Sequence, residues 1–265
     1  YLLIFIIGLC IGSFLNVIIL RLAENKNFIK GRSYCPKCKH KLFWYDNIPL
    51  ISFILLKGKC RYCHNRISIQ YPLVELATAI LFILAFKHWY AISNPSASSG
   101  QVFQFPISNY LLLFSYFIFT AILIIIFVYD FRWYMILDRV SVPAIITVFC
   151  LNLYLGKSVM DLLIAAFAIG GFFLLQFLIS KGKWIGGGDI RMGFLMGMML
   201  GLKNGAAALF ISYILGALVG IFLIIMGKKK MQSRMPFGTF LAVGAYIAML
   251  WGQEIIGWYV NLIRI

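Results

Sequence analysis

Long apolar runs constrain this chain more than any other feature of its sequence. Several of them continue for about 20 residues, the length that an α-helix needs to cross the hydrocarbon core of a bilayer. Of the 265 residues, 62% are hydrophobic and only 12% are charged, and the mean hydropathy is +0.92. A soluble domain alternates apolar and polar positions instead. The sequence therefore predicts an all-α polytopic membrane protein.

The apolar runs predict about eight transmembrane helices. They are expected near residues 1–20, 73–92, 109–129, 140–156, 159–180, 190–202, 205–227 and 237–262. Arg21, not a small-residue cleavage site, follows the first run, so we interpret that run as a retained helix and not as a signal peptide. The predicted domains are a first transmembrane helix at 1–20, a polar four-cysteine domain at 21–72 and a helical membrane domain at 73–265.

The basic residues predict the orientation of the chain. There are 24 Lys and Arg against 8 Asp and Glu, and all but four of the 24 lie in the segments 21–72, 130–139, 181–191 and 228–234. With eight spans and an external N-terminus, these segments share one side, which the positive-inside rule makes cytoplasmic. We therefore expect no nucleic-acid partner. We expect the lysines at 228–230 to bind anionic lipid headgroups.

Four of the six cysteines lie in the polar segment and form two CxxC pairs, Cys35 with Cys38 and Cys60 with Cys63. The 21 residues between the pairs are close to the spacing of a four-thiolate zinc site. Two disulfides are the alternative and would suit an external face. Because the charge distribution places this segment in the reducing cytosol, zinc is favoured. The metal would supply folding free energy that so short and basic a segment lacks.

Two aspartates occupy positions where a charge is expensive. Asp130 ends one apolar run, and Asp189 follows the three glycines Gly186–Gly188 between two others. Such acids are paired, hydrated or functional. Two carboxylates at one membrane face suggest acid–base hydrolysis of a peptide. In the alternative interpretation, the glycines form a turn and Asp189 caps the next helix.

Several motifs, taken in order, cover essentially the whole chain. They are Gly12-Ser13-Phe14-Leu15-Asn16-Val17 with Arg21-Leu22, the CxxC pairs with Trp44-Tyr45-Asp46-Asn47-Ile48-Pro49 between them, Tyr71-Pro72-Leu73-Val74-Glu75, Asp130 with Asp138, Gly186-Gly187-Gly188-Asp189, and Pro236-Phe237-Gly238. This ordered set resembles the type IV prepilin peptidases, membrane aspartyl proteases of the GxGD type. Leu137 stands where the family usually has proline, and Arg191 stands where lysine is common.

The resemblance implies a function and roles for particular residues. Family members cleave the short basic leader from prepilins or pseudopilins at the cytoplasmic face of the bacterial inner membrane, and many then methylate the new N-terminal amine with S-adenosylmethionine. Asp130 and Asp189 would be the catalytic pair, and Gly186–Gly188 would let the substrate backbone approach. Asp138 competes with Asp130 as the partner of Asp189. Glu75 either has its charge stabilised by the dipole at a helix start or takes part in methyl transfer.

Two other classes of function compete with the peptidase. A secondary transporter would use the two aspartates as a proton relay, but it would place them near mid-membrane and has no use for a zinc domain. A non-enzymatic pilus assembly factor would use the four-cysteine domain to bind a cytoplasmic partner. Cleavage of a prepilin peptide separates these two classes from the peptidase.

Overall fold

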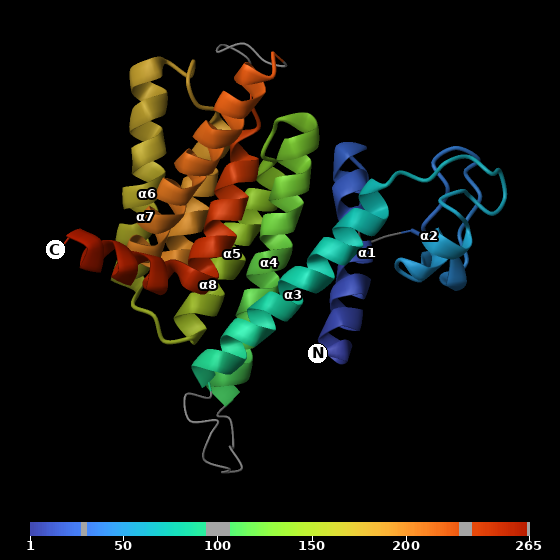
Figure 1. The fold of residues 1–265 in the computed structure, drawn as a ribbon, viewed down its shortest axis with the longest axis horizontal. Helices are drawn as coiled ribbons and strands as arrows, with labels where there is room; N and C mark the ends of the chain where they lie inside the picture. Colours follow the sequence, from blue (N-terminus) through green and yellow to red (C-terminus); the bar gives the residue numbers. More distant parts are fainter. Residues whose placement is uncertain (28–30, 94–106, 228–234, 264–265) are drawn as a thin grey trace. The chain divides into compact units, whose positions relative to one another are not determined.

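The structure, a computed structural model, describes residues 1–27, 31–93, 107–227 and 235–263, and these residues form helices without any strand (Figure 1). The elements are α1 (Leu2–Ala23), a 3-10 helix η1 (Trp44–Asn47), α2 (Ile51–Leu55), α3 (Gln70–Ser93), α4 (Ile107–Trp133), α5 (Asp138–Tyr154), α6 (Val159–Ser180), α7 (Gly187–Ile225) and α8 (Phe237–Ile263). The all-α prediction is confirmed. The lysines at 228–230, which we expect to bind lipid, lie outside the described residues.

Six helices of the described chain are long and apolar enough to cross a membrane: α1, α3, α4, α6, α7 and α8. The protein is therefore a multi-pass membrane protein. The segments 190–202 and 205–227, predicted as two helices, are joined in α7, which is interrupted at Gly201 with φ 76° and ψ 179°. The helix α5 has 17 residues and is too short to count among the six.

The chain packs into two compact units. One unit comprises Tyr1–Phe105 and Tyr116–Ile125, and the other comprises Pro106–Ser115 and Ile126–Ile265. In the first unit α1 packs against α3, and in the second unit α7 packs against α5, α6 and α8. Both aspartates singled out by the sequence belong to the second unit, whereas the four cysteines and Glu75 belong to the first.

In the first unit, small residues bring the backbones of α1 and α3 into contact. A Cβ atom on Gly8 would lie 2.5 Å from the Cα of Ala79, and one on Gly12 would lie 2.7 Å from the Cα of Glu75. The pairs run in opposite directions along the two helices, so α1 and α3 are antiparallel. This close packing is the usual way in which helices associate in a bilayer, where burial of apolar surface gives no driving force.

Close packing at glycines also fixes α7 between its neighbours in the second unit. A Cβ atom on Gly197 would lie 2.4 Å from the carbonyl oxygen of Ala165 in α6. In the contact between α7 and α8, a Cβ atom on Gly244 of α8 would lie 2.6 Å from the carbonyl oxygen of Ala208 in α7. These contacts hold α6, α7 and α8 in fixed positions, and with them the first turns of α7 and α8.

Candidate active site and metal centre

Asp130 lies in the last turn of α4, and its carboxylate contacts the first turn of α8. The residue is only 5% exposed, and its Oδ2 accepts a hydrogen bond of 2.9 Å from the backbone N–H of Thr239. A Cβ atom on Gly238 would lie 2.8 Å from that same oxygen, so only glycine fits here. Asp130 thus links the last turn of α4 to the amino end of α8.

Asp189 lies in the first turn of α7 and caps that helix. Its Oδ2 accepts a hydrogen bond of 3.1 Å from the N–H of Gly186, the N-cap residue, and the side chain is half-buried. The helix begins at Gly187, earlier than predicted, because this bond satisfies the amino end of the helix. The alternative interpretation, in which the glycines form a turn and Asp189 caps the next helix, is therefore wrong in detail: Gly186 is the N-cap, Gly187 and Gly188 belong to the helix, and Asp189 bonds back to the cap from the third helical position. This bond uses one of the two carboxylate oxygens of Asp189.

The structure brings Asp130 and Asp189 together although they are distant in sequence. Their carboxylates are close enough for their charges to interact. Ile136, in the linker between α4 and α5, lies between the two helix starts. A Cβ atom on Gly188 would be 2.9 Å from its Cβ, and one on Gly238 would be 2.9 Å from its Cδ1. Each aspartate thus lies at the amino end of a helix, and Ile136 packs against both ends.

Asp138, the alternative partner of Asp189, has a different environment. It is exposed, lies in the first turn of α5, and forms an ion pair with Arg191. Because Arg191 follows Asp189 by two residues, this pair joins the first turn of α5 to the second turn of α7, next to Asp189. Its contacts are those of a structural link between helix ends.

Tyr213 on α7 is a neighbour of Asp189 that the sequence did not reveal. It lies within electrostatic range of that carboxylate, and its hydroxyl donates a hydrogen bond of 3.1 Å to Oε1 of Gln176 on α6. Its ring centroid is 5.0 Å from that of Phe237. A tyrosine in an apolar helix matches the pattern of a packing residue, so no sequence signal marks it. The Pro236-Phe237-Gly238 motif is visible in the sequence, but its contact with Asp130 is not.

The four predicted metal ligands converge in the first unit. The sulfur atoms of Cys35, Cys38, Cys60 and Cys63 all lie within 4.8 Å of one another, and no histidine of the described chain joins them. All four are free thiols, and Cys35 Sγ is 3.9 Å from Cys63 Sγ, about twice the length of a disulfide bond. Four sulfurs at 2.3 Å around a tetrahedral zinc ion are roughly 3.8 Å apart. The donor set therefore fits zinc.

The two CxxC turns are built alike. In the first turn the N–H of Cys35 donates to the carbonyl of His40 (3.0 Å), and in the second the N–H of Cys60 donates to that of Asn65 (2.8 Å). The backbone N–H and side-chain amide of Asn65 also lower the pKa of the Cys63 thiol to about 6. A lowered thiol pKa favours the thiolate, which is the form that binds metal.

Glu75 connects the four-cysteine domain to α3. It is 6% exposed, and its Oε2 accepts a hydrogen bond of 2.9 Å from the N–H of Leu50, the N-cap residue of α2. The helix α3 begins at Gln70, so Glu75 lies in its second turn and not at the helix start as expected. One turn earlier, Asn16 of α1 donates to the carbonyl of Tyr71 (3.1 Å).

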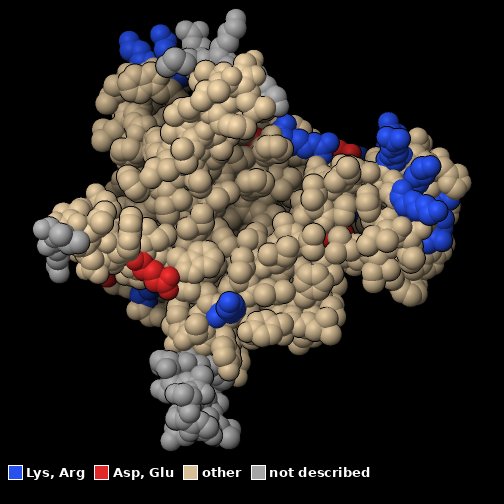
Figure 2. All heavy atoms as spheres, in the orientation of Figure 1, with Lys and Arg blue, Asp and Glu red and all other residues tan. Residues whose placement is uncertain are grey.

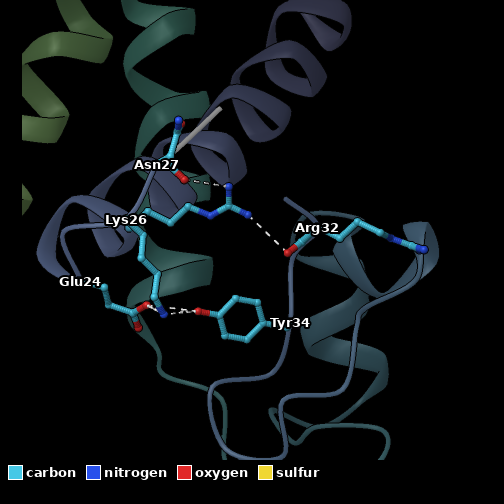
Figure 3. A network of polar contacts seen from close by, with 6 residues as sticks. Glu24, Lys26, Asn27, Arg32 and Tyr34 are labelled. Atoms are coloured by element: carbon cyan, nitrogen blue, oxygen red, sulfur yellow. Dashed lines mark hydrogen bonds and ion pairs between the residues drawn. The ribbon is translucent and has the colours of Figure 1, made fainter. Parts of the chain in front are cut away.

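A polar network also joins the end of α1 to the first CxxC turn (Figure 3). Arg21 donates to the carbonyl of Gly31 (2.9 Å), and Lys26 contacts both Glu24 Oε2 (2.6 Å) and the hydroxyl of Tyr34 (2.8 Å). These bonds give Arg21, a residue of the N-terminal motif, a structural role.

A multi-pass α-helical protein that brings two aspartates together at the ends of its helices has the construction of a membrane aspartic peptidase. Comparison with known families agrees with this class. The pattern described as the bacterial peptidase A24 N-terminal domain matches residues 6–89, and that of the type IV leader peptidase family matches residues 117–221. The chain belongs to the type IV leader peptidase family.

Individual relatives are similar along nearly their whole length. A prepilin leader peptidase/N-methyltransferase of Bacillus subtilis is 34% identical, with 97% of each chain covered. The protein of the same name from Aeromonas salmonicida is 30% identical, over 98% of this chain and 94% of the relative. The one from Legionella pneumophila is 29% identical, again over 98% and 94%. No solved structure matches the chain.

Proposed function

We propose that this chain removes the leader peptide of type IV prepilins or pseudopilins at the cytoplasmic face of the bacterial inner membrane. The observation that carries the proposal is the meeting of Asp130 and Asp189 at the amino ends of α8 and α7. Membership of the type IV leader peptidase family and relatives named prepilin leader peptidase support the same reaction.

The two carboxylates divide the proton transfers of peptide hydrolysis. Two neighbouring carboxylates cannot both ionise at low cost, so they share one proton. Asp189 is the less buried of the two, and we assign to it the general base that takes a proton from water. The water oxygen attacks the scissile carbonyl carbon while protonated Asp130 donates its proton to the carbonyl oxygen. When the tetrahedral intermediate breaks its C–N bond, the proton held by Asp189 passes to the leaving amine, and Asp130 takes a proton back from a hydroxyl of the intermediate, which restores the carbonyl group and the starting protonation of the pair.

We assign structural roles to the residues around this pair. Gly188 gives room for Ile136, and Gly238 gives room for the Asp130 carboxylate. Asp138, paired with Arg191, positions the amino end of α7 and is not the partner of Asp189. The resemblance implies that Gly186–Gly188 let the substrate backbone approach. We assign this role to Gly186 and Gly187, because these two glycines are exposed.

Zinc bound by Cys35, Cys38, Cys60 and Cys63 is proposed as the structural metal of the domain at 21–72. The segment is short, and between α1 and α3 the only secondary structure in the described chain is η1, α2 and two isolated β-bridges. Metal binding to four thiolates supplies the folding free energy that such a small core lacks. The remaining divisions, 1–20 and 73–265, keep their proposed roles as first transmembrane helix and peptidase domain.

Methylation of the new N-terminus, with S-adenosylmethionine as the donor, is proposed as a second activity because the relatives carry N-methyltransferase in their names. For Glu75, the bond to the Leu50 N–H favours a structural role in holding the four-cysteine domain.

Incubating the purified chain in lipid with a synthetic prepilin peptide tests the proposal. A peptidase yields the shortened product, whereas a transporter or an assembly factor leaves the peptide intact. An Asp189→Asn preparation controls for contaminating proteases. An intact peptide after incubation with folded wild-type protein would overturn the proposed function.

A further inference from the structure

The four-cysteine domain carries an exposed apolar surface that the proposed peptidase does not use. Trp44, Ile51, Ile54 and Leu55 are 77, 56, 70 and 76% exposed. Trp44 belongs to η1 and the other three to α2, and these two short helices contact each other. We call these four side chains the apolar ridge. Soluble domains rarely expose so many neighbouring large apolar side chains without a partner.

Lysines flank the apolar ridge directly. The turn that ends α2 carries Lys57 and Lys59, and both lysines are exposed. Their backbone N–H groups donate to the backbone carbonyls of Ile54 and Leu56, at 3.0 Å each, and hold the turn against α2. Apolar and tryptophan side chains next to lysines are the composition of segments that lie in a membrane interface.

The charge of the whole domain is positive and largely uncompensated. Its ion pairs within the described chain use only Lys26, with Glu24, and Arg61, with Asp46. No carboxylate pairs with the other lysines described in the domain, which are Lys37, Lys39, Lys41, Lys57 and Lys59. Lys and Arg side chains accordingly gather over the surface of this domain in Figure 2. A surface of this charge is complementary to anionic phosphate groups.

The attachment of α2 holds the apolar ridge close to a transmembrane helix. Leu50, which caps α2, donates its N–H to Glu75 at 2.9 Å, and Glu75 lies in the second turn of the span Gln70–Ser93. Three of the four ridge side chains, those of α2, therefore follow a residue that is bonded to the second turn of a membrane span.

We propose that the apolar ridge inserts into the headgroup region of an anionic bilayer, with Lys57 and Lys59 beside the lipid phosphates. The four-cysteine domain then lies on the membrane surface instead of extending into the cytoplasm. A basic leader peptide is a poorer occupant, because its charge has the same sign as that of the domain. This inference does not depend on the peptidase reaction and stands or falls separately from it.

Hydrogen exchange of the full chain in nanodiscs tests the proposal. Amides of 51–57 should exchange about tenfold more slowly in phosphatidylglycerol than in phosphatidylcholine, and high salt should reduce the difference. A Trp44→Ser/Leu55→Ser variant should lose this protection while keeping its exchange pattern around the four cysteines, which shows that the domain is folded. The control Trp184→Ser removes a tryptophan that is 73% exposed outside the domain, and should keep the protection.

A photoreactive benzophenone residue in place of Trp44 identifies what covers the apolar ridge. After irradiation in phosphatidylglycerol nanodiscs, the expected product is this chain carrying the mass of one lipid. A crosslink to another segment of the chain would overturn the proposal, since the ridge would then be a protein contact. Equal exchange of 51–57 in both lipids would overturn it as well.

Discussion

Asp130 and Asp189 differ in how firmly their surroundings hold them. Asp130 is buried and bonded to the N–H of Thr239 in another helix, whereas Asp189 is half-buried and bonded to the N–H of Gly186 in its own turn. This difference in surroundings determines which of the two carboxylates keeps the proton that they share.

Gly188 is a position where a single methyl group should matter. In Gly188→Ala the new Cβ would lie 2.9 Å from the Cβ of Ile136, which also packs against Gly238 beside Asp130. Overpacking of this kind costs about 1–3 kcal/mol. We expect prepilin cleavage to fall by about tenfold or more, measured as kcat/KM on a peptide substrate.

Gly187→Ala is the matched comparison, because nothing lies within 4 Å of a Cβ atom there. If packing against Ile136 is what requires glycine, this variant loses less activity than Gly188→Ala. The opposite order would show that the approach of the substrate to Gly187 limits activity more than packing does, and that the role of Gly188 is misassigned.

At the scale of the elements, the four-cysteine domain should depend on metal. Protein purified under reducing conditions should contain about one zinc ion per chain. A chelator should speed amide exchange over 35–63, because the two CxxC turns bury little besides Cys35 and Cys60. Metal-free protein with unchanged exchange protection would contradict a structural zinc site.

The interruption of α7 should be sensitive to any side chain. Gly201 has φ 76°, a conformation that other residues adopt at a cost, so Gly201→Ala should lower the free energy of unfolding by about 1 kcal/mol or more. The check is denaturant unfolding in detergent, with Gly171→Ala in α6 as the control. Gly171 has no atom near its Cβ position and should tolerate the change. Equal stability of the two variants would argue that α7 is straight.

Some elements of the fold could be predicted from the sequence and others could not. Apolar runs of span length predicted the helices, and the spacing of the CxxC pairs predicted the cluster of four sulfurs, because both signals are local. The sequence also predicted separate helices at 190–202 and 205–227, and α7 is indeed interrupted at Gly201, close to the predicted boundary. The contacts of Ile136 and Tyr213 could not be predicted, because apolar positions give no sign of which distant residue they meet.

At the scale of the molecule, the two compact units suggest that the two activities are separable. Asp189 lies in one unit, and hydrolysis needs the two acids and water, whereas methyl transfer has no use for two aspartates. We expect Asp189→Asn to abolish cleavage and to leave methylation of a pre-cleaved pilin largely intact, measured with labelled methyl donor. Loss of methylation in the folded variant would show that the sites are shared. No methylation by the wild type would mean that the chain is a peptidase only.

Cleavage of a prepilin peptide by three single variants tests the account most directly. Asparagine keeps an oxygen that can accept the Thr239 N–H bond, so the fold should survive in each variant. Asp130→Asn and Asp189→Asn should each reduce kcat by about a thousandfold, because each removes a partner in proton transfer. Asp138→Asn should lose only the ion pair with Arg191 and stay within about tenfold of the wild type. Cleavage that survives Asp130→Asn but not Asp138→Asn would contradict the assignment of the catalytic pair.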